Sequence, residues 1–108
     1  MFPVIRLVIA AAVLAAIPPA VFAADIEVVQ KNKKFSTTAV KAKVGDTLVF
    51  RNDDPFFHNI FSLTEGQSFD LGSYPQGESR KVVMKKEGTI EIECAIHPDM
   101  KLKVQVAK

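Results

Sequence analysis

The segment from Thr89 to Cys94 alternates strictly between side chains of opposite character. Ile90, Ile92 and Cys94 fall on one face of an extended chain, and the two glutamates between them fall on the other. A period of two is typical of a β-strand with one buried and one solvated face. The segment therefore predicts a strand that carries Cys94, the only cysteine in the chain, on its buried side.

Similar short strands are expected along the rest of the chain, because no stretch after residue 24 has a sustained helical period. Apolar and β-branched runs alternate with turn signals of Gly, Pro, Asn and Asp. The expected strands are 25–30, 35–43, 47–50, 58–63, 79–84, 89–94 and 102–106, and residues 66–77 are expected to form a turn-rich crossing. Seven to eight short strands predict an all-β fold, a Greek-key antiparallel β-sandwich.

A set of metal-binding side chains follows the end of strand 89–94. Cys94, His97 and Met100 are spaced three residues apart. Thiolate, imidazole and thioether together suit a copper ion that cycles between Cu(I) and Cu(II). Such a site needs a second imidazole, and His58 is the only other histidine. The predicted ligand set is therefore His58, Cys94, His97 and Met100.

The spacing within this set also predicts the shape of the chain. Three residues of extended strand span about 10 Å, which is too far for Cys94 and His97 to share one ion. In a tight turn, side chains three apart lie about 5–6 Å from each other. Pro98 keeps His97 out of the helical region. We expect the chain to leave its strand at Cys94 and to form a tight loop.

Other readings of the same residues remain open at this stage. Two histidines and a cysteine could hold a catalytic zinc ion, but Asp99 is the only carboxylate in the loop, and a thioether is a poor zinc ligand. A periplasmic copper chaperone or buffer would use similar ligands, although a cysteine on a rigid strand argues against easy release. A sandwich whose site stays empty in the cell is the third alternative.

Residues 1–23 have the features of a cleavable signal peptide. Arg6 precedes an apolar run from 7 to 17, and Val21-Phe22-Ala23 forms a small-residue cleavage site. The run is shorter than the about 20 residues needed to span a membrane, and Pro18-Pro19 interrupts it. We expect export to the periplasm and a single domain over residues 24–108, with a retained N-terminal anchor as the alternative.

Export and charge narrow the function further. A lone cysteine cannot form a disulfide within the chain, and a free thiol is a liability outside the cytoplasm, so metal ligation is the better explanation for Cys94. The chain has 14 basic and 12 acidic residues, a balance that argues against nucleic-acid binding. We expect a monomer without a membrane attachment after cleavage.

These features resemble the cupredoxins, the small blue-copper electron-transfer proteins. The short loop with Pro98 after the histidine is most similar to amicyanin, while residues 56–62 resemble plastocyanin-like exported proteins. The loop departs from amicyanin at Ala95-Ile96, where Thr-Pro is usual, and at Asp99, where an aromatic residue is usual. The matching residues are Val44-Gly45-Asp46-Thr47, Asn52, His58-Asn59, Gly88 and the Cys94–Met100 loop.

The resemblance implies a role for each ligand. His58, Cys94 and His97 would be equatorial ligands of a type 1 copper, Met100 would be the weak axial ligand, and Asn59 would hydrogen-bond to the Cys94 loop. It further implies a one-electron carrier between transient redox protein partners, a donor and an acceptor, and no enzymatic activity.

The resemblance also implies a route for the electron. His97 would be the exchange port, and Ile96, Pro98 and Phe57 would form an apolar rim around it. The charge of Asp99 at this rim suggests a partner with a basic or mixed face.

Overall fold

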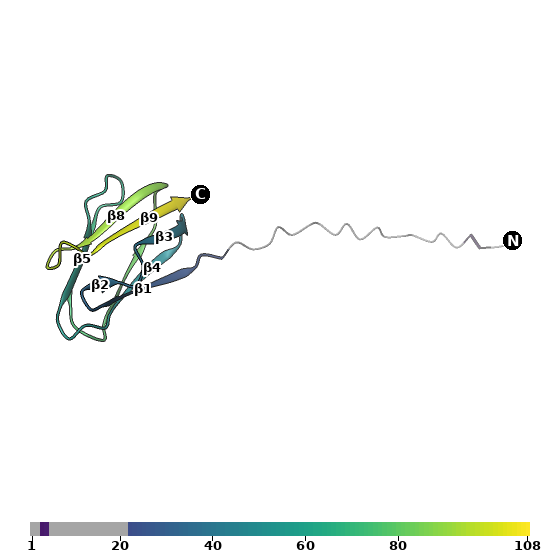
Figure 1. Cartoon of the computed structure of the whole chain (residues 1–108). Helices are drawn as coiled ribbons and strands as arrows, with labels where there is room; N and C mark the ends of the chain where they lie inside the picture. Colours follow the sequence, from purple (N-terminus) through teal and green to yellow (C-terminus); the bar gives the residue numbers. More distant parts are fainter. Residues whose placement is uncertain (1–2, 5–21) are drawn as a thin grey trace.

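Two β-sheets pack face to face in the structure, a computed structural model that describes residues 3–4 and 22–108 (Figure 1). Within these residues there are nine strands and no helix. Most of the predicted signal peptide, residues 1–23, lies outside the described residues, and no described helix is long and apolar enough to cross a membrane. The strands are β1 Asp25–Lys31, β2 Lys34–Phe35, β3 Ala39–Lys43, β4 Thr47–Asn52, β5 His58–Ser62, β6 Phe69–Tyr74, β7 Ser79–Val83, β8 Gly88–Cys94 and β9 Lys101–Ala107.

The predicted all-β sandwich is confirmed, and the strand pairing adds detail that the sequence did not contain. One sheet has the order β2-β1-β4-β7 and the other β3-β9-β8-β5-β6. The pairs β1–β4 and β3–β9 are parallel, while the other pairs are antiparallel, so both sheets are mixed rather than purely antiparallel. Each parallel pair joins strands far apart in the chain, and strand periodicity carries no information about such pairing.

Two strand boundaries differ from the sequence-based expectation. The expected strand 35–43 is split, because the chain crosses from one sheet to the other between Phe35 and Ala39. The expected crossing at 66–77 contains β6, whose pattern is broken at Gly72. That glycine has a φ of 71°, and its amide donates to the Asp70 carboxylate at 2.8 Å. The register between β5 and β6 also shifts, which explains why alternation did not reveal this strand.

The core forms where the inner faces of the two sheets meet. Ile90, Ile92 and Cys94 are all buried, as the alternation in β8 predicts. In β9 the three apolar side chains at alternate positions are buried in the same way. Leu48 and Phe50 of β4 are fully buried and join the same core from the opposite sheet. Burial of an apolar side chain of this size stabilises the fold by about 1.5–3 kcal/mol relative to exposure.

The predicted ligands His58 and Cys94 lie at the same end of the sandwich. There β4 ends at Asn52, β5 begins at His58, and β8 ends at Cys94. The β1–β2 hairpin lies at this end too, because Gln30 of β1 is the register partner of Asn52. We call this the site end of the sandwich. The polypeptide therefore brings ligand candidates from separate strands to one place without any helix.

Candidate metal centre

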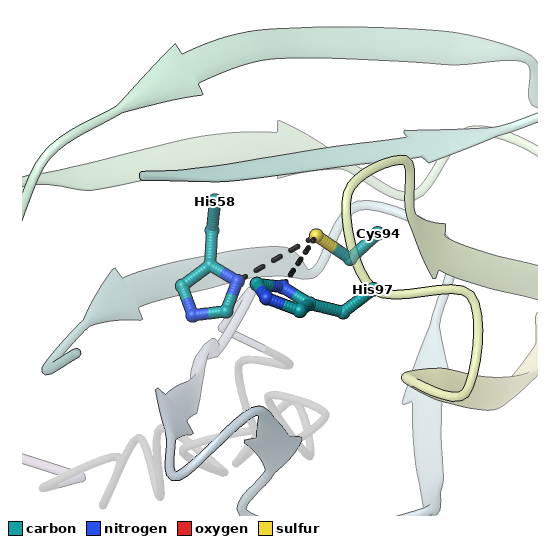
Figure 2. A group of neighbouring side chains, drawn as sticks. All are labelled: His58, Cys94 and His97. Carbon is teal, nitrogen blue, oxygen red and sulfur yellow. Dashed lines mark hydrogen bonds between the residues drawn. The ribbon is translucent and has the colours of Figure 1, made fainter. Parts of the chain in front are cut away.

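Three of the four predicted ligands lie together at the site end (Figure 2). The potential ligand atoms of His58, Cys94 and His97 are all within 4.8 Å of one another. The Cys94 Sγ atom is 3.5 Å from Nδ1 of His58 and 3.9 Å from Nδ1 of His97. Figure 2 shows both imidazole rings turned toward the sulfur, one from β5 and the other from the loop after β8.

This donor set fits a soft, thiolate-binding metal ion. A metal bound at about 2.0 Å from nitrogen and about 2.3 Å from sulfur separates tetrahedrally arranged donors by about 3.5 Å. The two sulfur–nitrogen distances are close to that value. His58 is fully buried and Cys94 is 1% exposed, while His97 is half-buried at the surface. The site is therefore dry on the inside and open on one side, through His97.

The loop between β8 and β9 has the predicted tight form. The amide of Met100 donates to the carbonyl of His97 at 2.9 Å and closes a turn around Pro98. At the start of the loop, the amide of Ala95 donates to the carbonyl of Asn59 at 2.9 Å. The expected bond from Asn59 to the Cys94 loop thus exists through the backbone. The side-chain Oδ1 of Asn59 is buried and has no hydrogen-bond partner among the described residues.

Met100 is the fourth predicted ligand, and it lies at the last loop position before β9. Its side chain is 2% exposed and belongs to the hydrophobic core. Its position at the end of the same loop as His97 is compatible with a weak axial ligand. Its role as a ligand remains a prediction.

Asp54 is a site residue that the sequence analysis missed. Its carboxylate is buried and accepts a hydrogen bond from Nε2 of His58 at 2.7 Å. The same carboxylate accepts the backbone amides of Asn32 and Lys33, at 2.6 and 3.1 Å, from the β1–β2 hairpin. Because Nε2 carries the proton in this bond, Nδ1 of His58 presents its lone pair toward Cys94. Asp54 thus fixes both the tautomer and the ring orientation of His58.

The electrostatics of Asp54 support this role. Burial raises the pKa of its carboxyl, but the hydrogen bonds from His58, Lys33 and Asn32 outweigh burial and leave the pKa below its ordinary value. The carboxylate is therefore ionised at neutral pH and acts only as an acceptor. The four-residue spacing between Asp54 and His58 was the available signal, but the Asp-Pro sequence indicated only a break between strands.

Asn52 shapes the same connection between β4 and β5. Its side-chain amide is fully buried and donates to the carbonyls of Phe56 and Tyr74, at 2.8 and 3.0 Å. Its Oδ1 accepts the amide of Asp54 at 2.8 Å. Two of these bonds hold the segment that delivers His58, and the third ties Asn52 to the end of β6.

Aromatic and apolar side chains surround the two imidazoles. The Phe56 ring lies 5.4 Å from the ring of His58 and 5.2 Å from that of His97. Burial, with the nearby His58 and the charge of Lys33, lowers the pKa of His97 below its ordinary value. His97 is therefore neutral at pH 7 and able to ligate through nitrogen. Phe57 and Ile96 are 55% and 52% exposed and Pro98 is exposed as well, and their grouping as an apolar rim around His97 remains a prediction.

Comparisons with known proteins point to one group. The chain is 30% identical over 84 residues to the methylamine utilization protein MauL of Methylorubrum extorquens, covering 77% of this chain and 74% of MauL. A reduced Cu(I) form of an amicyanin variant superposes with a TM-score of 0.70 and 26% identity, covering 76% of this chain and 81% of that one. No family model matches the sequence.

More distant structures share the fold. A purple cupredoxin from Nitrosopumilus maritimus has a TM-score of 0.67 and 23% identity over 77% of this chain and all of that one. A copper-containing nitrite reductase from Thermus scotoductus has a TM-score of 0.72 and 23% identity, but this chain spans only 22% of its length. The sandwich is thus similar in fold both to a whole cupredoxin chain and to one part of a larger copper protein.

Proposed function

The chain belongs to the cupredoxins, and on that basis we propose that it is an exported carrier of single electrons whose cofactor is one copper ion. The observation that carries this proposal is the position of the Cys94 sulfur, 3.5 and 3.9 Å from two imidazole nitrogens in a largely buried site. A bound copper ion would supply the Cu(I)/Cu(II) couple. His58, Cys94 and His97 would hold it, with Met100 as a weak axial ligand.

The rigidity of the ligand supports favours an electron carrier over a copper-handling protein. Cys94 is the last residue of β8, a strand that pairs with β5 on one side and β9 on the other. His58 is held from behind by Asp54. Side chains fixed in this way need little rearrangement when the charge of a bound ion changes, and they also oppose release of that ion. A chaperone or buffer would need a more open and mobile site.

His97 is the proposed exit for the electron. Of the three clustered residues it alone is substantially exposed, and the residues that precede His58 and His97, Phe57 and Ile96, have exposed side chains. Apolar side chains of this kind exclude water from a brief contact, and transient redox encounters use small interfaces. We propose that a donor and an acceptor protein use this face in turn. The chain then binds no substrate and acts without enzymatic chemistry.

The proposed export and domain limits rest on the N-terminal sequence. Cleavage after Ala23 would release a domain of residues 24–108, and every described strand lies within it. The backbone of Ala24 is already part of the sheet edge, since its amide donates to Asp46 and its carbonyl accepts from Thr47, both at 2.9 Å. A periplasmic location for the processed protein follows from this proposal.

The visible spectrum after addition of Cu(II) tests the function directly. We expect an intense blue to green band from a Cys94 thiolate–Cu(II) bond, bleached reversibly by dithionite. The variant Cys94→Ser should remain folded and lack the band, and Cys94→Ser and the native protein should have similar far-ultraviolet circular dichroism. A colourless copper complex of the native protein would overturn the carrier proposal in favour of copper handling.

A further inference from the structure

The β1–β2 hairpin places a group of lysines beside the metal centre. Lys31, Lys33 and Lys34 are all exposed, and Lys31 and Lys34 face each other as register partners across the hairpin. Within the described part of the chain, none of the three forms an ion pair. We call these three residues the lysine hairpin. Three uncompensated positive charges so close together create a local field that attracts negatively charged surfaces.

The backbone of this hairpin is unusual at Lys33. The two residues of the turn, Asn32 and Lys33, have φ angles of 56° and 57°. A turn with two positive φ values matches the twist of the strands, and its second position strongly favours glycine. A lysine there is conformationally unfavourable, because its Cβ is crowded in the left-handed region. The position therefore carries a side chain that the turn itself does not need, which points to a role for the side chain.

The lysine hairpin is fixed in place relative to the proposed electron exit. The amides of Asn32 and Lys33 donate to the Asp54 carboxylate, which also binds His58. The Lys33 Nζ lies 5.9 Å from the centre of the Phe56 ring, and that ring lies 5.2 Å from the ring of His97. Only the Phe56 ring would thus separate a partner bound to Lys33 from His97, the proposed electron exit.

Most other charges at this end of the molecule are bound to one another. Glu78 is paired with Arg80, Glu27 and Asp53 share Arg51, and the Asp54 carboxylate is buried and bound to His58. Asp99 is the one exposed carboxylate on the ligand loop. The earlier expectation of a basic or mixed partner face relied on Asp99 alone. The hairpin adds three exposed lysines at this end of the molecule, which that expectation did not consider.

We propose that the lysine hairpin is the recognition element for an acidic surface of a redox partner protein, docking it against the apolar rim of Phe57 and Ile96. This inference rests on the proposed electron-carrier function and specifies the partner of the same site. Electrostatic attraction would orient the partner over His97 and raise the association rate, while the apolar rim would permit rapid release.

Two small oxidants of opposite charge test the field at the exit in the copper-loaded protein. Each accepts one electron: hexacyanoferrate(III) is an anion, and tris(phenanthroline)cobalt(III) is a cation. Replacing Lys31 and Lys34 by Glu together should slow oxidation by the anion about tenfold at low salt and accelerate oxidation by the cation. In 1 M salt, where the Debye length is about 3 Å, these differences should vanish.

A glycine variant separates the electrical role of Lys33 from any structural role. Lys33→Gly relieves the unfavourable backbone conformation, so its melting temperature should be unchanged or higher, while the rate with the anion falls severalfold. The matched control is Lys85→Glu. Lys85 follows Met84, whose amide donates to the carbonyl of Asp46 just before β4 begins. Because β4 is six residues long and ends at the site end, Lys85 lies about 20 Å from that end. Equal effects of Lys33→Gly and Lys85→Glu, or no effect of either, would overturn the proposal.

A measurement on the metal-free protein keeps this test independent of copper. Titration with a hexaglutamate peptide should shift the backbone amide resonances of residues 31–34 and of Ile96, and the Lys31→Glu/Lys34→Glu variant should not respond. Largest shifts at Lys85 and Lys86, or binding to phosphatidylglycerol vesicles without binding to the peptide, would refute an acidic protein partner. A protein that never becomes blue yet binds the peptide at the hairpin would instead refute the electron-carrier function alone.

Discussion

Removal of the Asp54 carboxylate should damage the site in a way that separates folding from metal binding. In Asp54→Ala, the Nε2 proton of His58 loses its only acceptor at a position that is fully buried. The amides of Asn32 and Lys33 lose theirs as well, but this turn is exposed and water can replace the bond. A buried donor left unpaired costs about 1–3 kcal/mol, so the loss of stability should be about 1–3 kcal/mol.

That loss is measurable without a bound metal. For a domain of this size, 1 kcal/mol lowers the melting temperature by about 4–8 °C, so Asp54→Ala should melt roughly 4–24 °C below the native protein. The native stability of small domains is about 5–15 kcal/mol, and the variant should therefore still fold. Thermal unfolding of the metal-free protein, followed by circular dichroism, provides this comparison.

Asp54→Asn should affect copper binding more than the stability of the fold. Its Oδ1 can keep the Asn32 amide, but its amide group then replaces the oxygen that binds both the Lys33 amide and Nε2 of His58. The imidazole must present Nε2 as an acceptor and carry its proton on Nδ1, the atom that faces the Cys94 sulfur. Stability should fall by less than in Asp54→Ala, whereas copper affinity should fall about 10–100-fold.

The neighbouring residue supplies the control. Asp53 is half-buried and its carboxylate binds the Arg51 side chain on the surface, so Asp53→Asn should change the melting temperature by only a few degrees and leave copper affinity unaltered. Competition with a chelator of known affinity measures the binding. If Asp54→Asn binds copper as tightly as Asp53→Asn does, Asp54 does not set the tautomer of His58, and the reasoning fails.

Three further predictions concern other residues. Met100→Leu should keep the visible band and raise the reduction potential, because a weaker axial donor stabilises Cu(II) less; complete loss of copper would make Met100 a primary ligand. Ile96→Glu adds a charge that repels the proposed acidic partner, so it should slow electron transfer to that partner with little change in potential or melting temperature, and an unchanged rate would place the exit elsewhere. Hydrogen bonds from the amides of Ala24 and Lys43 lower the pKa of Asp46 in the folded protein. The ionised Asp46 therefore stabilises the fold fully above about pH 4, and this stabilisation is lost as the pH falls through the lower folded-state pKa. Asp46→Asn should therefore flatten the acid limb of a melting-temperature profile, and a profile parallel to that of the native protein would contradict this.

The predictable parts of this molecule depend on contacts that are local in the sequence. Strict alternation in β8 and β9 placed Cys94 on the inner face, since successive side chains of a strand must point to opposite sides. The loop between the two strands followed from the reach of three residues and from Pro98. His58 was found by elimination, because the chain has no other second imidazole. The structure brings it to the other two as expected.

The parts that escaped prediction depend on contacts between distant segments. Gln30 and Asn52 become neighbours through the parallel pair β1–β4, and the hydrophobic pattern of the sequence does not predict which strands pair. The lysine hairpin therefore could not be placed beside His97 from the sequence alone. Asp54 was hidden for a related reason: an aspartate before a proline is usual in a turn, and only the fold shows that its carboxylate points inward.

The segment between β4 and β5 therefore acts as the second half of the site, although its sequence suggested only a break. Asn52 fixes the path of the backbone, Asp54 orients His58, and Phe56 packs against both imidazoles. None of these contacts needs a metal ion, and each ends on backbone or side chains that are already held by the sheets. These contacts hold His58 in its orientation through the protein itself. A site prepared in this way changes little between two oxidation states, because the forces that hold its ligands do not come from the ion itself.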